Sequence, residues 1–250
     1  MSRNFHEIDS QETPLGLLSL RRRRMLSLGD IEIHEIKLGE AFLMSSLFHE
    51  AEVALAHRGL SELTGVGWDV VVGGLGLGYT AVAALEHREV ASLLVIEALP
   101  QVIGWHLSSL VPLGEKLVND PRSRLVHADF FASASSASGF DPDKPGRKFH
   151  AVLLDIDHSP RDLLHGNNAA FYQPEGLRAL SAHLLPGGVF ALWSDDEPDA
   201  EFLHKLGSVF ATARAHVVTF DNPILESKSD STVYVACLDE DKQDGAELKR

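Results

Sequence analysis

Short runs of branched apolar residues alternate with amphipathic segments through most of this chain. Apolar runs occupy residues 68–74, 92–98, 124–129, 150–157 and 188–194, and helical periodicity follows most of them. Continuous apolar strands that alternate with helices are typical of a parallel sheet covered on both faces. The pattern therefore predicts a doubly wound α/β domain with a mostly parallel, seven-stranded sheet.

The two ends of the chain depart from this alternation. The last apolar runs, residues 214–220 and 231–238, have no helix between them and predict an antiparallel pair at the sheet edge. Near the start, short alternating stretches are broken by Gly-Asp at 29–30, which predicts a hairpin. We therefore expect a small antiparallel β unit over 1–44 with a frayed start over 1–12, and a disordered charged tail over 239–250. Between them we expect an α/β domain over 45–238, which opens with a helix over 45–60 and has another single helix over 100–118.

Composition narrows the classes of partner. The net charge of −14 argues against nonspecific binding to nucleic acid or to an anionic membrane, and it is compatible with a small cationic substrate. The chain has one cysteine, Cys237, and no run of 18 apolar residues. These features lead us to expect a cytoplasmic protein without a membrane partner.

A glycine-rich segment, Gly-Gly-Leu-Gly-Leu-Gly at 73–78, ends the first strand of the predicted sheet. Ligands of doubly wound sheets lie beyond the carboxyl ends of the strands, so Gly74, Gly76 and Gly78 are candidate cofactor-binding residues. Their spacing is G-x-G-x-G, and Tyr79 stands where a dinucleotide-binding loop has its third glycine, which disfavours NAD. A ligand without a pyrophosphate fits better, and a plain tight turn is the alternative.

Two carboxylates follow the next strands. Glu97 ends the second strand, where a carboxylate can accept hydrogen bonds from ribose hydroxyls, and Asp129 ends the third, where one can accept from an adenine amine. Each could instead cap a helix or be solvated. Together with the glycines, they favour a sulfonium ligand that carries an adenosine.

At this point the chain resembles the spermidine synthase family, which has the class I S-adenosylmethionine-dependent methyltransferase fold, a Rossmann-like fold, behind a small N-terminal β domain. The likeness covers roughly residues 14–238. "SLFHEAEVALA" is similar to the family's Tyr-His-Glu helix, with His49 and Glu50 in the last two places. The other matching segments are "VVGGLGLGYTA", "VIEALPQVI", "RLVHADFF", "HAVLLDIDHSP" and the Phe-Tyr segment that contains Tyr172.

The resemblance implies transfer of an aminopropyl group from decarboxylated S-adenosylmethionine to a diamine. It implies that Glu97 and Asp129 hold the nucleoside, that His49 and Glu50 cap the donor, and that Asp155 is the catalytic carboxylate. Tyr172 is expected to contact the substrate. Members of the family commonly form dimers or tetramers, and we expect a homodimer.

The sequence departs from the family pattern at three places, all in the expected binding sites for the donor tail and the acceptor. The glycine loop has no carboxylate, Asp-Ser-Ser-Asp is replaced by Asp155-Ile156-Asp157-His158, and the late Tyr-Pro-Ser-Gly segment is missing. Adenosyl binding is therefore better supported than spermidine synthesis. Methyl transfer from S-adenosylmethionine and a noncatalytic binder of adenosyl ligands or polyamines both stay open.

The expected chemistry is displacement at a carbon attached to S⁺. An amine nucleophile with a pKa of about 10.4 must lose a proton at neutral pH, at a cost of roughly 4.6 kcal/mol, and a carboxylate can accept that proton. Asp155 and Asp157 alternate along a strand end, so they start on opposite faces. The family match favours Asp155, while Asp157 and His158, where the strand gives way to a loop, could reach the acceptor. The loop that follows, 159–173, is a plausible lid.

A second acidic pair, Asp195 and Asp196, follows the fifth strand. It could cap the next helix, form the wall of a pocket for a cationic acceptor, or join Asp155 or Asp157 in a magnesium site. His158 and His165 lack the spacing of zinc ligands, and no metal is expected.

Overall fold

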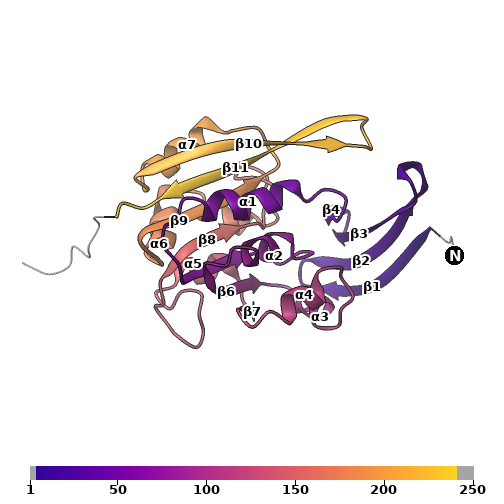
Figure 1. Ribbon diagram of the computed structural model, residues 1–250, viewed down its shortest axis with the longest axis horizontal. Coiled ribbons are helices and arrows are strands. Elements are labelled where there is room, and N and C mark those ends of the chain that lie inside the picture. The colour runs from indigo at the N-terminus through magenta and orange to yellow at the C-terminus, as the bar shows by residue number, and fades with distance from the viewer. Residues whose placement is uncertain (1–3, 241–250) are drawn as a thin grey trace, which may run out of the picture.

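Two β-sheets organise the protein in the computed structural model, which describes residues 4–240 (Figure 1). The larger sheet has seven strands in the order β10-β11-β9-β8-β5-β6-β7. Neighbours from β9 through β7 are parallel. β11 is antiparallel to β10, as predicted, and it is also antiparallel to β9. The strands are β5 (Trp68–Gly73), β6 (Val90–Glu97), β7 (Ser123–His127), β8 (Phe149–Leu154), β9 (Leu184–Ser194), β10 (Thr212–Asn222) and β11 (Ser227–Cys237).

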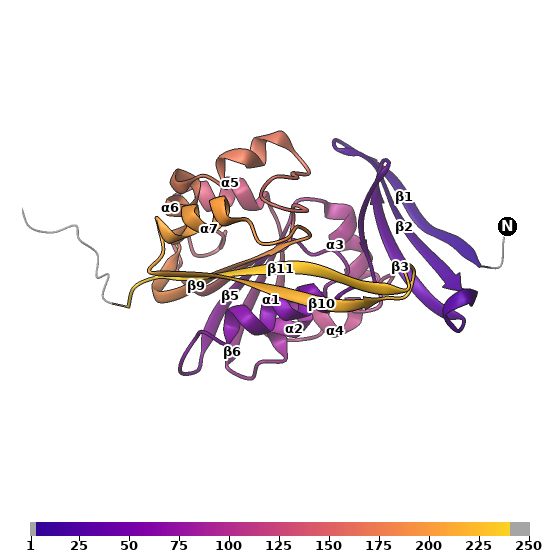
Figure 2. The same ribbon diagram turned by 90° about the horizontal axis from the view of Figure 1, so that it is seen from above.

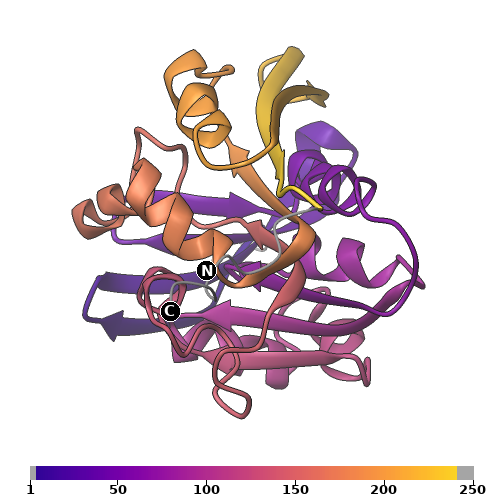
Figure 3. The same cartoon turned by 90° about the vertical axis from the view of Figure 1, so that its left-hand side faces the viewer.

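Helices cover both faces of this sheet, because its central strands are apolar on both sides (Figures 2 and 3). One face packs against α1 (Glu50–Leu60), α2 (Tyr79–Leu85), α3 (Pro100–Leu107) and α4 (Gly114–Val118). The other packs against α5 (Phe130–Ser135), α6 (Pro174–Ser181) and α7 (Ala200–Gly207). Within the described residues, no helix has the length and apolar character needed to cross a membrane.

The smaller sheet is antiparallel, with strands β1 (Phe5–Thr13), β2 (Gly16–Met25), β3 (Ile31–Leu38) and β4 (Ala41–Ser45) in that order. The Gly29-Asp30 turn between β2 and β3 was predicted, with a 3-10 turn (Leu26–Leu28) before it. The expected frayed start is wrong for residues 5–12, which pair with β2. The Asp9 carboxylate anchors β1 by accepting a 2.6 Å hydrogen bond from the indole nitrogen of Trp105 in α3.

Two predicted helices have different bounds in the structure. The helix expected over 45–60 begins at Glu50, because Ser45 pairs with Glu35 as the last residue of β4. The segment expected as one helix over 100–118 is divided into α3 and α4. α3 ends at Leu107, and Ser109 adopts a left-handed conformation with a φ of 54°. Pro112, which follows, has no main-chain N–H to donate and could not continue the helix. The charged tail, from residue 241 on, lies outside the described residues.

The smaller sheet lies at the end of the larger one where the parallel strands finish (Figures 1 and 2). Met44 of β4 reaches the glycine loop after β5, where its sulfur accepts a hydrogen bond from the main-chain nitrogen of Leu77 at 2.9 Å. The two sheets therefore enclose the carboxyl ends of β5, β6, β7 and β8, which is where a doubly wound sheet binds its ligands.

Candidate functional site

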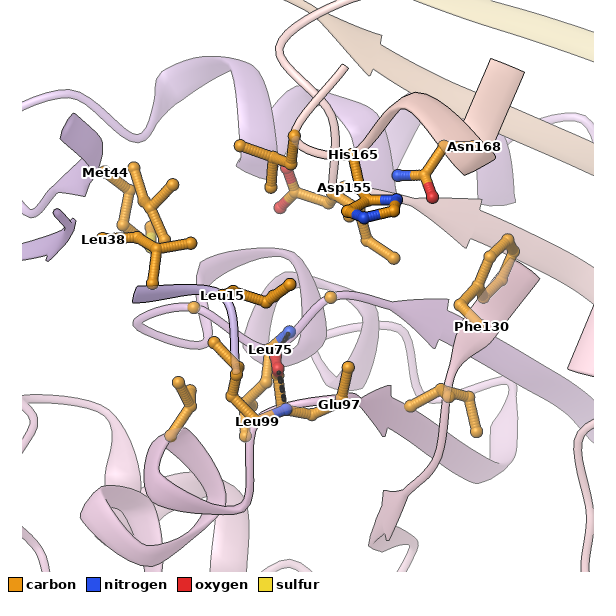
Figure 4. Close-up of a pocket in the computed structure, with 18 of the residues that line it drawn as sticks. Leu15, Leu38, Met44, Leu75, Glu97, Leu99, Phe130, Asp155, His165 and Asn168 are labelled. Carbon is orange, nitrogen blue, oxygen red and sulfur yellow. Dashed lines mark hydrogen bonds between the residues drawn. The ribbon is translucent and has the colours of Figure 1, made fainter. Parts of the chain in front are cut away.

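A cavity of about 370 Å³ lies between the two sheets (Figure 4). Its size is within the usual range for small-molecule sites, roughly 300–1,000 Å³. Four carboxylates line it, those of Glu52, Glu97, Asp129 and Asp155, and none of the described lining residues is Lys or Arg. The lining therefore favours a ligand with positive charge.

The glycine loop brings the main chain close to the end of β8. Gly74 (φ 93°) and Gly76 (φ 46°) adopt left-handed conformations and line the cavity. A Cβ at Gly74 would overlap the main-chain carbonyl oxygen of Asp155, and one at Gly76 would overlap the sulfur of Met44. Gly78 (φ 93°) lies outside the lining, where it precedes α2 and packs beside His106.

Glu97 lies at the centre of the predicted nucleoside site. Its carboxylate accepts hydrogen bonds from the main-chain nitrogens of Leu75 at 3.0 Å and Leu99 at 2.8 Å (Figure 4). These bonds fix the carboxylate between the glycine loop and the segment after β6. Burial raises the pKa of Glu97, and the main-chain hydrogen bonds partly oppose that shift.

Asp129 lines the cavity and also caps a helix. Its Oδ1 accepts hydrogen bonds from the main-chain nitrogens of Phe131 at 2.8 Å and Ala132 at 3.0 Å, at the start of α5. The helix-cap reading of the sequence is therefore confirmed, and both cap bonds go to the same oxygen. Contact between Asp129 and a bound adenine stays a prediction.

Asp155, the first residue after β8, lines the cavity with a fixed carboxylate. The hydroxyl of Thr80, in α2, donates a 2.6 Å hydrogen bond to its Oδ2. Burial raises the pKa of Asp155 to about 6, against the opposing effect of that hydrogen bond. A carboxylate with this pKa is ionised at neutral pH and can still take up a proton during a reaction.

Glu52 was not predicted as a site residue, yet it lines the same cavity from α1. Burial and, next, the charge on Asp155 raise the pKa of Glu52 to about 8. Glu52 precedes Leu55, Ala56 and Gly59 by three, four and seven positions, which places it on the apolar stripe of the helix. A carboxylate on the buried face of a predicted helix was the signal in the sequence that could have indicated Glu52 as a site residue.

His49 and Glu50 lie outside the lining of the cavity. The His49 ring stacks on Tyr79, with centroids 4.2 Å apart, and the exposed Glu50 carboxylate accepts a hydrogen bond from the His49 main-chain nitrogen. Because α1 begins at Glu50, Glu52 is the acidic residue of this helix that reaches the cavity. The prediction that His49 and Glu50 cap the donor finds no contact to support it.

Asp157 and Tyr172 are also absent from the lining, and both are buried. The Asp157 carboxylate accepts hydrogen bonds from the Tyr172 hydroxyl at 2.8 Å, the Asn168 amide at 2.9 Å and the Leu164 main-chain nitrogen at 2.8 Å. These bonds hold the loop after β8, which includes a 3-10 helix (Gly166–Ala170), so they indicate a positioning role in place of the predicted catalytic and substrate contacts. His158, by contrast, does line the cavity, and His165, Asn167 and Asn168 of the loop join it.

The acidic wall predicted from Asp195 and Asp196 is wrong. Both side chains follow the end of β9 and are exposed and outside the lining, while Trp193 of β9 lines the cavity. The cap of the following helix is Asp199, which accepts a hydrogen bond from the Glu201 main-chain nitrogen at 2.8 Å. In the part of the chain that the structure describes, no group of three or more His, Cys, Asp and Glu side chains is arranged to hold a metal ion.

The smaller sheet contributes a wall that the sequence did not predict. Its lining residues are all aliphatic or thioether side chains: Leu15, Ile36, Leu38, Leu43 and Met44. This wall closes the cavity on the side opposite the strand ends.

No family profile matches the chain, and no curated protein matches it in sequence. Among solved structures, it is similar to a spermidine synthase in complex with the transition-state analogue AdoDATO, with a TM-score of 0.72 and 17% identity over 97% of this chain and 80% of that one. A spermidine synthase from Thermotoga maritima gives a TM-score of 0.69 and 17% identity over the same shares. A probable spermidine synthase from Corynebacterium glutamicum gives 0.58 and 13% over 95% and 80%. The chain therefore has a spermidine synthase-like fold, a class I methyltransferase-like sheet behind a small N-terminal β-sheet.

Proposed function

We propose that this protein is a transferase that moves an alkyl group from an S-adenosyl sulfonium donor to an amine. The observation that carries the proposal is the meeting of Glu97, Asp129, Asp155 and the glycine loop in one cavity without a lining Lys or Arg among the described residues. The spermidine synthase-like fold supports an aminopropyltransferase-like activity, and the neighbour's complex with AdoDATO supports an adenosyl ligand.

Each end of the nucleoside has a candidate partner. Glu97 is held so that its carboxylate can accept hydrogen bonds from both ribose hydroxyls. Asp129, beside Phe130 and Phe131 in the lining, would accept a hydrogen bond from the adenine amine. Gly74 and Gly76 allow the donor tail to lie close to the main chain.

In the transfer step, the lone pair of the acceptor amine attacks the carbon bound to S⁺. The C–S bond breaks and its electron pair goes to sulfur, which leaves as a neutral thioether. The amine proton passes to the Asp155 carboxylate. A pKa of about 6 leaves Asp155 ionised at neutral pH, so it first attracts the ammonium form of the acceptor and then takes its proton.

The donor tail distinguishes aminopropyl from methyl transfer. Decarboxylated S-adenosylmethionine carries only an ammonium on its tail, whereas S-adenosylmethionine adds a carboxylate. Glu52 and Asp155 would attract the ammonium and repel the carboxylate, so we favour the decarboxylated donor. Glu52 thereby supplies the negative charge that the glycine loop lacks.

Mass spectrometry of the products tests this proposal. The protein is incubated with either donor and a pool of small amines. We expect 5′-methylthioadenosine and an aminopropylated amine from the decarboxylated donor, a product that Asp155→Asn abolishes and Glu115→Gln, an exposed change on α4, retains. Formation of a methylated amine and S-adenosylhomocysteine would show that the protein transfers a methyl group and not an aminopropyl group. Absence of product from both donors would favour a noncatalytic binder. The expected homodimer stays a prediction, which light scattering in solution tests.

A further inference from the structure

We infer that the acceptor is a monoamine with a hydrocarbon chain, and not a diamine. This inference rests on the proposed transfer and concerns the part of the cavity beyond Asp155. There the smaller sheet forms an aliphatic wall, and Asp195 and Asp196, the residues expected to hold a second ammonium, lie outside the lining.

The cavity has two ends of different character (Figure 4). Phe130 marks one end and follows Asp129, the candidate adenine partner. Leu38 and Met44 mark the other end, and Asp155 lies between the two. The loop after β8 and Trp193 add no carboxylate to the lining near Asp155. An amine that attacks a carbon held there can extend its remaining atoms toward the smaller sheet.

The smaller sheet offers that part of the molecule no negative charge. The wall consists of Leu15, Ile36, Leu38, Leu43 and Met44. Glu35 and Asp9 of this sheet are engaged outside the cavity, where Glu35 binds Arg23 at 2.6 Å and Asp9 binds Trp105 at 2.6 Å.

The carboxylates that line the cavity are expected to bind the donor or the attacking amine, and not the far end of the acceptor. Glu97 and Asp129 lie at the nucleoside end, and Glu52 and Asp155 share the space where the donor ammonium and the attacking amine meet. A second acceptor ammonium would have to leave water without a counter-ion against an aliphatic wall. An amine that ends in a methyl group at the same place would instead bind more tightly, by about fourfold in affinity for each buried carbon of its chain.

Calorimetry with two amines of equal length tests the inference. Pentylamine and butane-1,4-diamine differ only in whether the far end is a methyl or an ammonium. We expect pentylamine to bind at least about tenfold more tightly to the protein saturated with 5′-methylthioadenosine. Equal or tighter binding of the diamine, or binding of neither amine, overturns the inference while leaving the adenosyl site in place. Failure of 5′-methylthioadenosine itself to bind overturns the proposed function as well.

A pair of variants tests whether the aliphatic wall sets this preference. Leu38 is half-buried, so Leu38→Asp adds a carboxylate to the wall and Leu38→Asn is its uncharged control. We expect Leu38→Asp to shift the ratio of the two affinities at least about tenfold toward the diamine and Leu38→Asn to leave diamine binding weak. Leu43→Asp provides a second position if Leu38→Asp fails to fold. An unchanged ratio in a folded Asp variant overturns the inference.

Discussion

The carboxylates of Glu52 and Asp155 face one cavity from different elements, and the charge on Asp155 helps to raise the pKa of Glu52. Burial raises the pKa of both carboxylates, to about 8 for Glu52 and to about 6 for Asp155, so the pair shares close to one proton at neutral pH. A ligand that brings an ammonium between them would stabilise the doubly ionised pair. Glu52 therefore couples ligand binding to release of a proton.

The first prediction measures that proton. Binding of decarboxylated S-adenosylmethionine at pH 7 is expected to release close to one proton, because the ammonium lowers the pKa of Glu52. Calorimetry in buffers of different ionisation enthalpy counts released protons. Glu52→Gln should abolish the release, and 5′-methylthioadenosine, which has no ammonium, should cause little. Equal proton release by the wild type and by Glu52→Gln would contradict the coupling.

The second prediction concerns stability against pH. The pKa of Glu52 is raised by folding, so between the unfolded and folded pKa values the native state binds more protons than the unfolded state. The free energy of unfolding should then fall as pH rises through this window, from roughly 4.5 to about 8. Glu52→Gln removes the cost of ionising a buried carboxylate. At pH 9 the variant should therefore unfold at a higher temperature than the wild type, by roughly 2–4 °C for each kcal/mol gained in the free energy of unfolding.

The comparison that checks this second prediction is made at two pH values. At pH 4.5 both proteins are largely neutral at this position, so the difference in melting temperature should be much smaller than at pH 9. A Glu52→Gln protein less stable than the wild type at pH 9 would show that the carboxylate is held by contacts that outweigh its desolvation.

The strands and the carboxylates at their ends were accessible from the sequence because both depend on local patterns. Apolar runs identified the parallel strands, and Glu97, Asp129 and Asp155 stand at strand ends that a parallel sheet brings to one edge. Glu52 was missed because its role depends on where α1 begins and which face it buries. Asp157 was misassigned because its partners, Tyr172 and Asn168, approach only when the loop folds back.

The third prediction separates two glycines of one loop. Gly74→Ala places a methyl group against the main-chain carbonyl of Asp155, which cannot move without disturbing β8, so we expect a loss of more than about 3 kcal/mol or failure to fold. Gly76→Ala meets the flexible side chain of Met44, so its loss should be smaller and should be partly recovered in the double variant with Met44→Ala. Chemical denaturation measures both losses. Equal losses at the two positions would contradict this reading of the loop.

The fourth prediction assigns Asp157 and Tyr172 to loop positioning. Tyr172→Phe removes one hydrogen bond to the buried Asp157 carboxylate and should cost about 1–3 kcal/mol of unfolding free energy. Affinity for 5′-methylthioadenosine should change less than threefold, because neither residue lines the cavity. Denaturation and calorimetry on the same variant give both numbers. A large loss of affinity without a loss of stability would restore Tyr172 to the ligand site.

The most direct measurement of the central claim is a crystal structure of the protein soaked with 5′-methylthioadenosine. We expect the ribose hydroxyls to donate hydrogen bonds to the Glu97 carboxylate, the adenine amine to lie beside Asp129 and the thioether to lie near Asp155. A structure with the nucleoside bound outside this cavity, or with its ribose turned away from Glu97, would contradict the proposed adenosyl site.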